Sequence, residues 1–279
     1  MSLAVIVPKG MFPRHADIVR DVTVRICLTG ATGHVGRELV KAIAAAPDLV
    51  LCAAVGRRGA GEVLGGVTVD ASLGAALARG DADVVVDYTH PDVVKGHVQQ
   101  AIGAGCGVVV GTSGLSDADY TEIDAWARTR GVGVFAAGNF SVTAALLQHF
   151  AMTAARQMPH WEILDYASDA KPDAPSGTAR ELAYQLAKVA KPDWKVPVAD
   201  TKGMKEARGA ALNGSQLHSI RVPGYYSAVQ AVFGDAGERI ELRHESTSYV
   251  PYVTGTLLAA RQVNSFTGLK RGMSELLGL

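Results

Sequence analysis

The sequence predicts an α/β protein with two parts: a Rossmann-type domain built on a parallel sheet, and a smaller α+β domain whose open sheet is mostly antiparallel. Continuous valine runs at 84–86 and 108–110 are typical of parallel strands that are buried on both faces. They alternate with segments of helical periodicity, as the strands of a doubly wound sheet do. Three runs of strand-like alternation after position 214 predict the second sheet.

The predicted elements follow one another in a regular order from Thr23. A short strand at 24–28 ends in a glycine turn at 30–36, and apolar residues then recur at helical spacing through Ile43. After Asn139 the pattern changes from strand–helix alternation to a helix-and-sheet mixture. Further strands are expected at 49–55, 84–86, 108–110, 132–137, 161–166, 216–222, 228–233 and 239–244, and further helices at about 92–104, 117–130, 141–157, from 176 and at 252–264.

Composition narrows the class of protein. Lys and Arg number 27 and balance 27 Asp and Glu, so the formal net charge is +0 and no basic field favours nucleic acid. No apolar run approaches the roughly 20 residues that span a bilayer, and the irregular leader at 1–22 lacks the features of a secretory signal. A cytoplasmic protein without membrane or nucleic-acid partners is therefore expected. Neither the 3 cysteines nor the histidines have the spacing of a metal site, and the cysteines are expected to be free thiols in the core.

The glycine turn has the spacing of a dinucleotide site. Residues 30–36 read Gly-x-x-Gly-x-x-Gly between a strand and a helix. Glycine lets the backbone approach a pyrophosphate, and the free N–H groups at the start of the helix attract its charge. Glycines that merely serve a turn would give the same triplet, but the strand–turn–helix context favours a cofactor. The expected cofactor contacts are Gly30, Thr32, Gly33, His34, Val35 and Gly36.

The end of the second strand indicates which dinucleotide binds. NAD sites usually carry a carboxylate there for the ribose hydroxyls, but this chain has Val55-Gly56-Arg57-Arg58. Two guanidinium groups can clamp a 2′-phosphate, or they can simply solvate a loop. Arg57 and Arg58 therefore favour NADPH as the cofactor, with NADH as the alternative.

The segment 171–179, Lys-Pro-Asp-Ala-Pro-Ser-Gly-Thr-Ala, predicts a pocket for a small anionic molecule. Ser176 is a suitable N-cap, and apolar residues continue a helix behind it. Backbone N–H groups and hydroxyls of Ser176, Gly177 and Thr178 can bind a carboxylate or phosphate, with Lys171 as the counter-charge. A plain capped helix would carry the same pattern.

Together with four other blocks, this segment resembles the 4-hydroxy-tetrahydrodipicolinate (dihydrodipicolinate) reductases of bacterial lysine biosynthesis. Segments 220–224 and 243–246 are more weakly similar, so the likeness extends over nearly the whole chain from Thr23. The blocks occur in the family's order: the glycine turn, Asp87-Tyr88-Thr89-His90-Pro91, Gly111-Thr112-Ser113-Gly114, Ala137-Gly138-Asn139-Phe140-Ser141 and 171–179.

The resemblance implies hydride transfer from NAD(P)H to a small cyclic imine or enamine carboxylate, in a homotetramer. It implies a dinucleotide-binding domain at 23–138 with 250–279, and a domain for substrate binding and oligomerisation at 139–249. Residues that would border the nicotinamide or hold a substrate carboxylate follow from the matching motifs. They are Gly111, Thr112, Asn139 and Phe140 for the nicotinamide, and Lys171, Gly177 and Thr178 for the carboxylate.

One departure from the family concerns the proton donor. The family has two adjacent histidines four and three residues before the lysine, where this chain has Ala167 and Ser168, and Tyr249 replaces a family arginine. Alanine cannot donate a proton, so the substrate or the route of protonation is expected to differ, with Lys171 as the catalytic residue. Tyr166, Ser168, Asp169, Tyr249 and solvent remain as other donors. An amino-acid dehydrogenase of related architecture, and an NADPH-binding protein that has lost catalysis, are the alternative functions.

Overall fold

The first of two sheets is parallel apart from one short pair of strands. The computed structural model describes residues 23–279, and the predicted leader at 1–22 lies outside this range. The strand order is β13-β7-β6-β5-β1-β2-β4-β3, and only the β3–β4 pair is antiparallel. The strands are β1 (Val24–Thr29), β2 (Leu49–Val55), β3 (Val63–Leu64), β4 (Val67–Asp70), β5 (Val84–Asp87), β6 (Gly107–Val110), β7 (Gly133–Ala136) and β13 (Gly268–Arg271).

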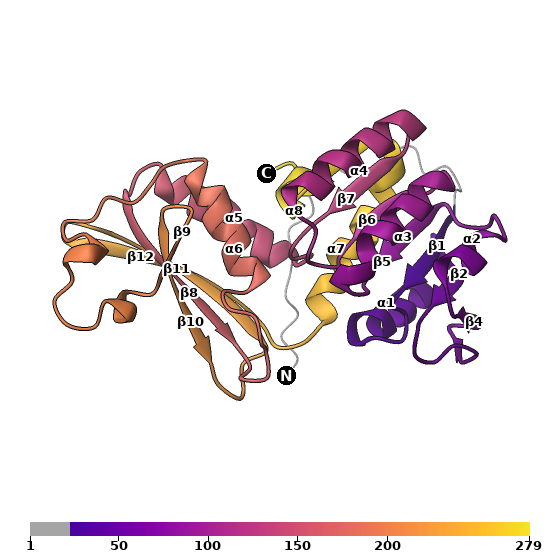
Figure 1. Cartoon of the computed structure of the whole chain (residues 1–279), viewed down its shortest axis with the longest axis horizontal. Helices are drawn as coiled ribbons and strands as arrows, with labels where there is room; N and C mark the ends of the chain where they lie inside the picture. Colours follow the sequence, from indigo (N-terminus) through magenta and orange to yellow (C-terminus); the bar gives the residue numbers. More distant parts are fainter. Residues whose placement is uncertain (1–22) are drawn as a thin grey trace, which may run out of the picture.

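Helices cover both faces of this sheet (Figure 1). On one face Ile26 and Leu28 of β1 pack against α1 and α7, while the alternate residue Cys27 joins a second core beneath α2, α3 and α4. The predicted doubly wound sheet is therefore confirmed. The helices are α1 (His34–Ala45), α2 (Leu73–Leu77), α3 (Pro91–Gly103), α4 (Asp117–Arg130), α7 (Val250–Gln262) and α8 (Met273–Leu277), with a 3₁₀ turn at Val263–Ser265.

The second sheet is smaller and has helices on one face. Its order is β12-β11-β8-β10-β9, and all neighbouring pairs are antiparallel except β8–β10, so the predicted mostly antiparallel sheet is confirmed. Along β8 (His160–Ala167) buried and half-buried residues alternate, because one face packs on α5 (Val142–Ala155) and α6 (Gly177–Ala187). The other strands are β9 (Ala210–Leu212), β10 (Ser215–Arg221), β11 (Ser227–Asp235) and β12 (Glu238–Ser246), and 3₁₀ turns lie at Val198–Asp200 and Lys205–Arg208.

The C-terminal segment returns to the first sheet after the second is complete. Helix α7 packs against α1, and β13 pairs in parallel with β7 at the edge of the first sheet. The short elements β3, β4, β9, β13, α2 and α8 were not predicted, because runs of two to five residues are too short to show a period. No helix within residues 23–279 is long and apolar enough to cross a membrane.

Candidate functional site

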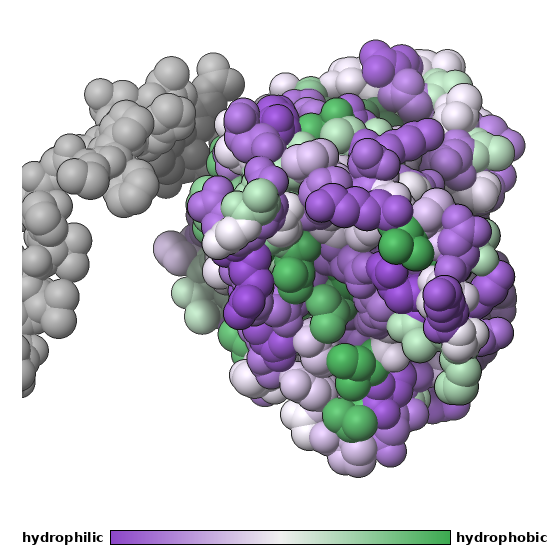
Figure 2. All heavy atoms as spheres, turned by 90° about the vertical axis from the view of Figure 1, so that its left-hand side faces the viewer, coloured by the Kyte–Doolittle hydropathy of each residue, from purple (hydrophilic) through white to green (hydrophobic). Residues whose placement is uncertain are grey.

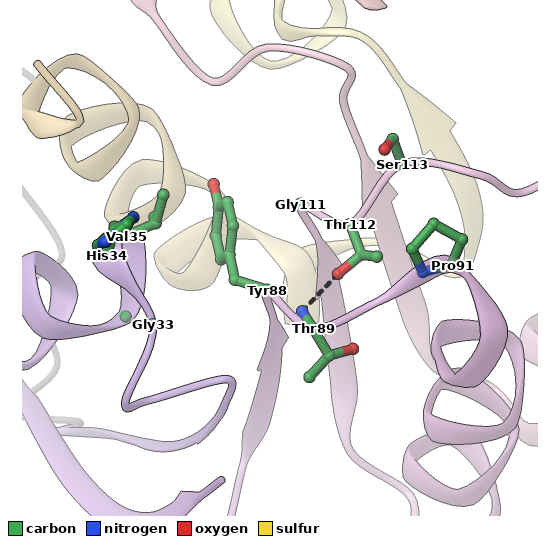
Figure 3. Close-up of a pocket in the computed structure, with 10 residues that line it drawn as sticks. Gly33, His34, Val35, Tyr88, Thr89, Pro91, Gly111, Thr112 and Ser113 are labelled. Atoms are coloured by element: carbon green, nitrogen blue, oxygen red, sulfur yellow. Dashed lines mark hydrogen bonds between the residues drawn. The ribbon is translucent and has the colours of Figure 1, made fainter. Parts of the chain in front are cut away.

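A cavity of about 360 Å³ lies at the carboxyl end of the first sheet. It opens beside β1, the strand at which the order of strands reverses: β2 lies on one side of β1, and β5 lies on the other. Such a switch point is where open α/β sheets bind their ligands. Figure 3 shows the ring of Tyr88 near the middle of the lining, with the glycine turn to one side and the 111–113 loop to the other. The lining residues are Gly33, His34, Val35, Gly36, Tyr88, Thr89, Pro91, Gly111, Thr112 and Ser113.

The glycine turn can be built only from glycine at two of its positions. Gly30 has φ of 76°, and a Cβ there would lie 2.0 Å from the carbonyl oxygen of Tyr88. A Cβ at Gly36 would lie 2.2 Å from the carbonyl oxygen of Gly30. Gly33 is the N-cap of α1 and has no side chain to cap the helix, so a bound pyrophosphate can accept hydrogen bonds from the first N–H groups. The cradle therefore fits a dinucleotide.

The two arginines after β2 lie on an exposed loop next to this turn. Arg57 and Arg58 are both exposed, and the Thr32 hydroxyl donates to the Arg58 carbonyl oxygen (3.0 Å). The loop is thereby tied to the glycine turn at its backbone, while its guanidinium groups stay accessible. Further along, Arg37 of α1 pairs with Glu62 at 3.4 Å.

Behind the cavity, the carboxylate of Asp87 ties three loops together. Its Oδ1 accepts hydrogen bonds from the hydroxyls of Thr89 (2.8 Å) and Thr112 (2.5 Å), and its Oδ2 accepts from Thr29 Oγ1 (2.7 Å) and His97 Nδ1 (2.8 Å). Burial raises the pKa of the Asp87 carboxyl, but these hydrogen bonds together outweigh it and hold that pKa below its usual value. Asp87 is therefore ionised, and it fixes the hydroxyls of two residues that line the cavity.

The loop that crosses to the second sheet is bonded to the predicted anion anchor. Asn139 Nδ2 donates to Thr178 Oγ1 (3.0 Å), and both residues are only 8% exposed. Phe140 is 1% exposed and packs its ring against Phe135 and Tyr88. Only the backbone of Phe140 can therefore face a ligand.

The anchor helix begins as predicted. The Ser176 hydroxyl accepts from Ala179 N (3.3 Å) and caps α6. The Ser176 N–H donates to Asp165 Oδ2 (2.8 Å), which also accepts from Arg221 at 2.7 Å. The same Nη2 of Arg221 also donates to the Asp173 carbonyl oxygen (2.9 Å). The buried Asp165–Arg221 pair thus holds the 173–176 loop, a contribution to the site that the sequence alone did not suggest.

Lys171 lies at the rim of the anchor with its charge partly compensated. Its Nζ lies 2.7 Å from Asp173 Oδ1, and 37% of its side chain is exposed. Lys171 and Arg180 together lower the pKa of the Asp173 carboxyl, against the effect of burial, which raises it. The ammonium group is therefore positioned and accessible, as a carboxylate-binding lysine must be.

The residues at the positions where the resemblance implies two histidines offer no proton donor to the predicted anchor. Ala167 is 1% exposed, and the Ser168 hydroxyl donates to Asp169 Oδ1 (3.2 Å). Tyr166 lies on the opposite face of β8 from Ala167, where its hydroxyl donates to Gln230 Oε1 (3.1 Å) and Arg243 lies 4.5 Å from its ring centroid.

Tyr249 lies on the cofactor side of the molecule. Its hydroxyl is 3.1 Å from His34 Nδ1 of the glycine turn, and the two rings are 5.2 Å apart. Tyr226 contacts the other side of the Tyr249 ring, edge-on at 4.7 Å. Tyr249, where the resemblance implies an arginine, therefore contacts the glycine turn rather than the predicted anchor.

A polar chain continues from the crossover loop into the second domain's core. The Ser141 and Thr143 hydroxyls are 2.9 Å apart, and Thr143 Oγ1 is 3.1 Å from His244 Nδ1. Burial lowers the pKa of the His244 imidazole, and Glu245 opposes this only in part. His244 is therefore neutral near pH 7 and serves as a hydrogen-bonding group in the core.

The structure brings part of the expected site together. The cavity is lined by Gly33, His34, Val35, Gly36, Gly111 and Thr112 among the expected residues. Asn139 and Thr178 are bonded to each other, but neither they nor Lys171, Ser176 and Gly177 line this cavity. Asp87 and Tyr88 are the main additions; a carboxylate directly after an all-valine strand was the available signal for Asp87. Within residues 23–279, no group of three or more His, Cys, Asp or Glu residues could hold a metal ion.

A glycine cradle beside a switch point, joined through one loop to a helix start that is predicted to bind an anion, is typical of a pyridine-nucleotide-dependent oxidoreductase, and the family findings show that this chain is an enzyme of that class. Two family models give the family: "Dihydrodipicolinate reductase, N-terminus" matches residues 24–140, and "Dihydrodipicolinate reductase, C-terminus" matches residues 143–277. The chain belongs to the dihydrodipicolinate reductase family.

Individual relatives cover nearly the full length. The 4-hydroxy-tetrahydrodipicolinate reductase of Synechococcus elongatus is 38% identical over 267 residues, which is 90% of this chain and 98% of the relative. The enzyme of the same name from Mycolicibacterium smegmatis is 37% identical over 256 residues, 91% of this chain and 99% of the relative. Among solved structures, the dipicolinate-bound dihydrodipicolinate reductase from Paenisporosarcina sp. TG-14 has a TM-score of 0.78 at 28% identity, covering 91% of this chain and 99% of that one.

Proposed function

We propose that this enzyme uses NADPH to reduce 4-hydroxy-tetrahydrodipicolinate or a closely related cyclic imine or enamine carboxylate. The observation that carries the proposal is the buried hydrogen bond from Asn139 to Thr178 (3.0 Å). It joins the loop expected at the nicotinamide to the helix start expected at the substrate carboxylate. A hydride donor and an anionic acceptor would therefore be held side by side.

Each part of the chain has a separate task in this reaction. The N–H groups at the start of α1 hold the pyrophosphate, and Lys171 with the N-terminus of α6 holds a substrate carboxylate. Bound NADPH supplies the hydride. Lys171 then supplies the proton, because Ala167 and Ser168 stand where the resemblance implies the family's two histidines and the Lys171 ammonium is accessible.

NADPH oxidation with freshly generated 4-hydroxy-tetrahydrodipicolinate tests the proposal, beside a dihydrodipicolinate reductase of known activity. Turnover close to that of the control is expected if this compound is the substrate. Turnover with another cyclic imine carboxylate, and none with this one, would mean that the altered 167–171 loop accepts a different ring. NADPH binding without turnover of any such compound would leave the non-catalytic alternative and contradict the proposal.

The preference for NADPH is supported by the two exposed arginines and by the lack of a carboxylate at the end of β2, where Gly56 follows Val55. A 2′-phosphate beside Arg57 and Arg58 would find two accessible guanidinium groups. NADH would bind more weakly through the same glycine turn.

We also propose the domain division 23–138 with 250–279 for the dinucleotide and 139–249 for substrate binding and oligomerisation, in a cytoplasmic homotetramer. The assembly is supported by the face of the second sheet opposite α5 and α6, because the half-buried apolar residues Leu164, Ile220 and Val232 lie on it. Figure 2 looks at the end of the molecule formed by this sheet and shows apolar residues along the middle of it. Light scattering is expected to give four chains per particle, and a monomer at working concentration would contradict the assembly.

A further inference from the structure

The carboxylate of Asp87 is placed where a charge could act on the cofactor. Asp87 ends β5 and is 0% exposed. The next two residues along the chain, Tyr88 and Thr89, line the cavity, and so does Thr112, which donates to Asp87 Oδ1. Figure 3 shows Thr89 and Thr112 joined by a hydrogen bond at the cavity wall. A single layer of residues therefore separates this carboxylate from the cavity.

The hydrogen bonds around Asp87 require the ionised acid. Both oxygens accept, one from Thr89 and Thr112 and the other from Thr29 and His97. A carboxylate only accepts hydrogen bonds. The NH₂ group of an asparagine in its place would face either Thr89 and Thr112 or Thr29 and His97, which are themselves donors. Within residues 23–279, the only basic side chain paired with Asp87 is His97, on α3. The hydroxyl donors stabilise the negative charge without cancelling it.

A buried negative charge at this point distinguishes the two forms of the cofactor. Hydride donation moves two electrons and one hydrogen nucleus to the substrate and leaves the nicotinamide ring with one positive charge. A fixed carboxylate across one layer of protein stabilises that positive charge, because the medium between them has a low dielectric constant. The neutral reduced ring gains no comparable stabilisation.

We infer that Asp87 is a positioning and electrostatic residue of this enzyme, whose buried carboxylate favours the oxidised nicotinamide over the reduced one and so promotes hydride donation. The inference rests on the proposed function, because it needs the nicotinamide in the cavity lined by Tyr88 and Thr112. It also makes Thr89 and Thr112 the groups through which Asp87 orients the cavity wall.

The test compares binding of NADP⁺ and NADPH to the wild type and to Asp87→Asn, by titration calorimetry or cofactor fluorescence. The dissociation constant for NADP⁺ is expected to rise about tenfold relative to that for NADPH, a typical effect of one unit charge through one layer of protein. A purely structural role would weaken both forms equally and leave the ratio of the two constants unchanged. An unchanged ratio in a folded Asp87→Asn protein would overturn the inference.

Three further variants keep the test decisive. Asp87→Ser removes the charge with less bulk, and the same change of ratio is expected if Asp87→Asn does not fold. Asp235→Asn changes an exposed aspartate at the end of β11 and is expected to leave the ratio unchanged. His97→Asn keeps a hydrogen-bond donor on Asp87 and should also leave it unchanged; tighter NADP⁺ binding in that variant would mean that His97 had neutralised Asp87, against the inference. Failure of the wild type to bind either cofactor would instead contradict the proposed function.

Discussion

The glycine turn at 30–36 and the segment 167–171 belong to the two halves of the proposed site, but they are built in different ways. The turn is determined by backbone contacts: a Cβ at Gly30 or Gly36 would lie within 2.2 Å of a carbonyl oxygen. The loop is determined by side chains that satisfy one another, with Ser168 bonded to Asp169 and Lys171 to Asp173. Substitutions at 168–171, which are half-buried or exposed, are expected to cost little folding energy, whereas Gly30 and Gly36 of the turn accept almost none.

This difference bears on the departures that the resemblance implies. Ala167 and Ser168 stand where the family is expected to have two histidines, and the Asp165–Arg221 pair holds the 173–176 loop near them. The glycine turn and Ser176, Gly177 and Thr178 are present as the resemblance requires. In the proposed site, chemistry at the substrate can therefore change while the binding of both ligands is retained.

The largest expected effect is on the loop side, at Lys171. Lys171→Met removes the ammonium but keeps the length of the side chain, and kcat is expected to fall about 10²–10⁴-fold because the proton donor is lost. The dissociation constant of NADPH should stay within about twofold, since the glycine turn is untouched. Steady-state kinetics and a cofactor titration measure the two quantities.

The matched control is Lys188→Met, which changes a lysine at the other end of α6 that contacts Tyr184. Its kcat should equal that of the wild type. A Lys171→Met enzyme with full activity would mean that solvent or another side chain donates the proton, and it would remove Lys171 from the catalytic residues.

The next effect is on the turn. In Gly36→Ala the new methyl group meets the Gly30 carbonyl oxygen and the Ala31 backbone, neither of which can move without opening the turn. The affinity for NADPH is expected to fall about 100-fold, or roughly 2.7 kcal/mol. Calorimetric titration measures the loss. Gly96→Ala in α3, where a Cβ meets nothing within 4 Å, should bind NADPH like the wild type, and equal binding by Gly36→Ala would refute the backbone account of the turn.

The same contrast explains how much the sequence could predict. Strands and the glycine turn follow from local patterns, because apolar runs and glycine spacing act within a few residues. Apart from the neighbouring Thr89, the donors to Asp87 lie 10 to 58 residues away from it along the chain, and Tyr249 lies 215 residues from His34. Only the fold brings them together, so spacing carries no signal of these contacts. The strand β13 was missed because four residues show no period, and its long-range pairing with β7 leaves no local signal either.

A smaller effect separates the two cofactors. Arg57→Ala is expected to weaken NADPH binding about tenfold and NADH binding less than about twofold, because only NADPH carries the 2′-phosphate that a guanidinium can bind. Raising the salt concentration should reduce the difference, as Arg57 is exposed. Arg156→Ala, another exposed arginine at the end of α5, is the control. Equal weakening of NADPH and NADH by Arg57→Ala would remove Arg57 from the cofactor site.

The smallest effect is a pH dependence of stability that belongs to the second domain. Burial lowers the pKa of His244 in the folded protein, whereas in the unfolded chain it returns to about 6.5. The unfolded state therefore binds the proton first as the pH falls below about 6.5, and stability decreases with falling pH in that range. The unfolding temperature is expected to drop by about 2–4 °C between pH 7.5 and 5.5 through this residue.

The drop should be smaller in His244→Gln than in the wild type, and as large as in the wild type in His149→Gln, on α5. An equal drop in His244→Gln and in the wild type would mean that another group causes the acid sensitivity. The hydrogen bonds from Ser141 through Thr143 to His244 would then contribute to the structure of the second domain but not to its pH dependence.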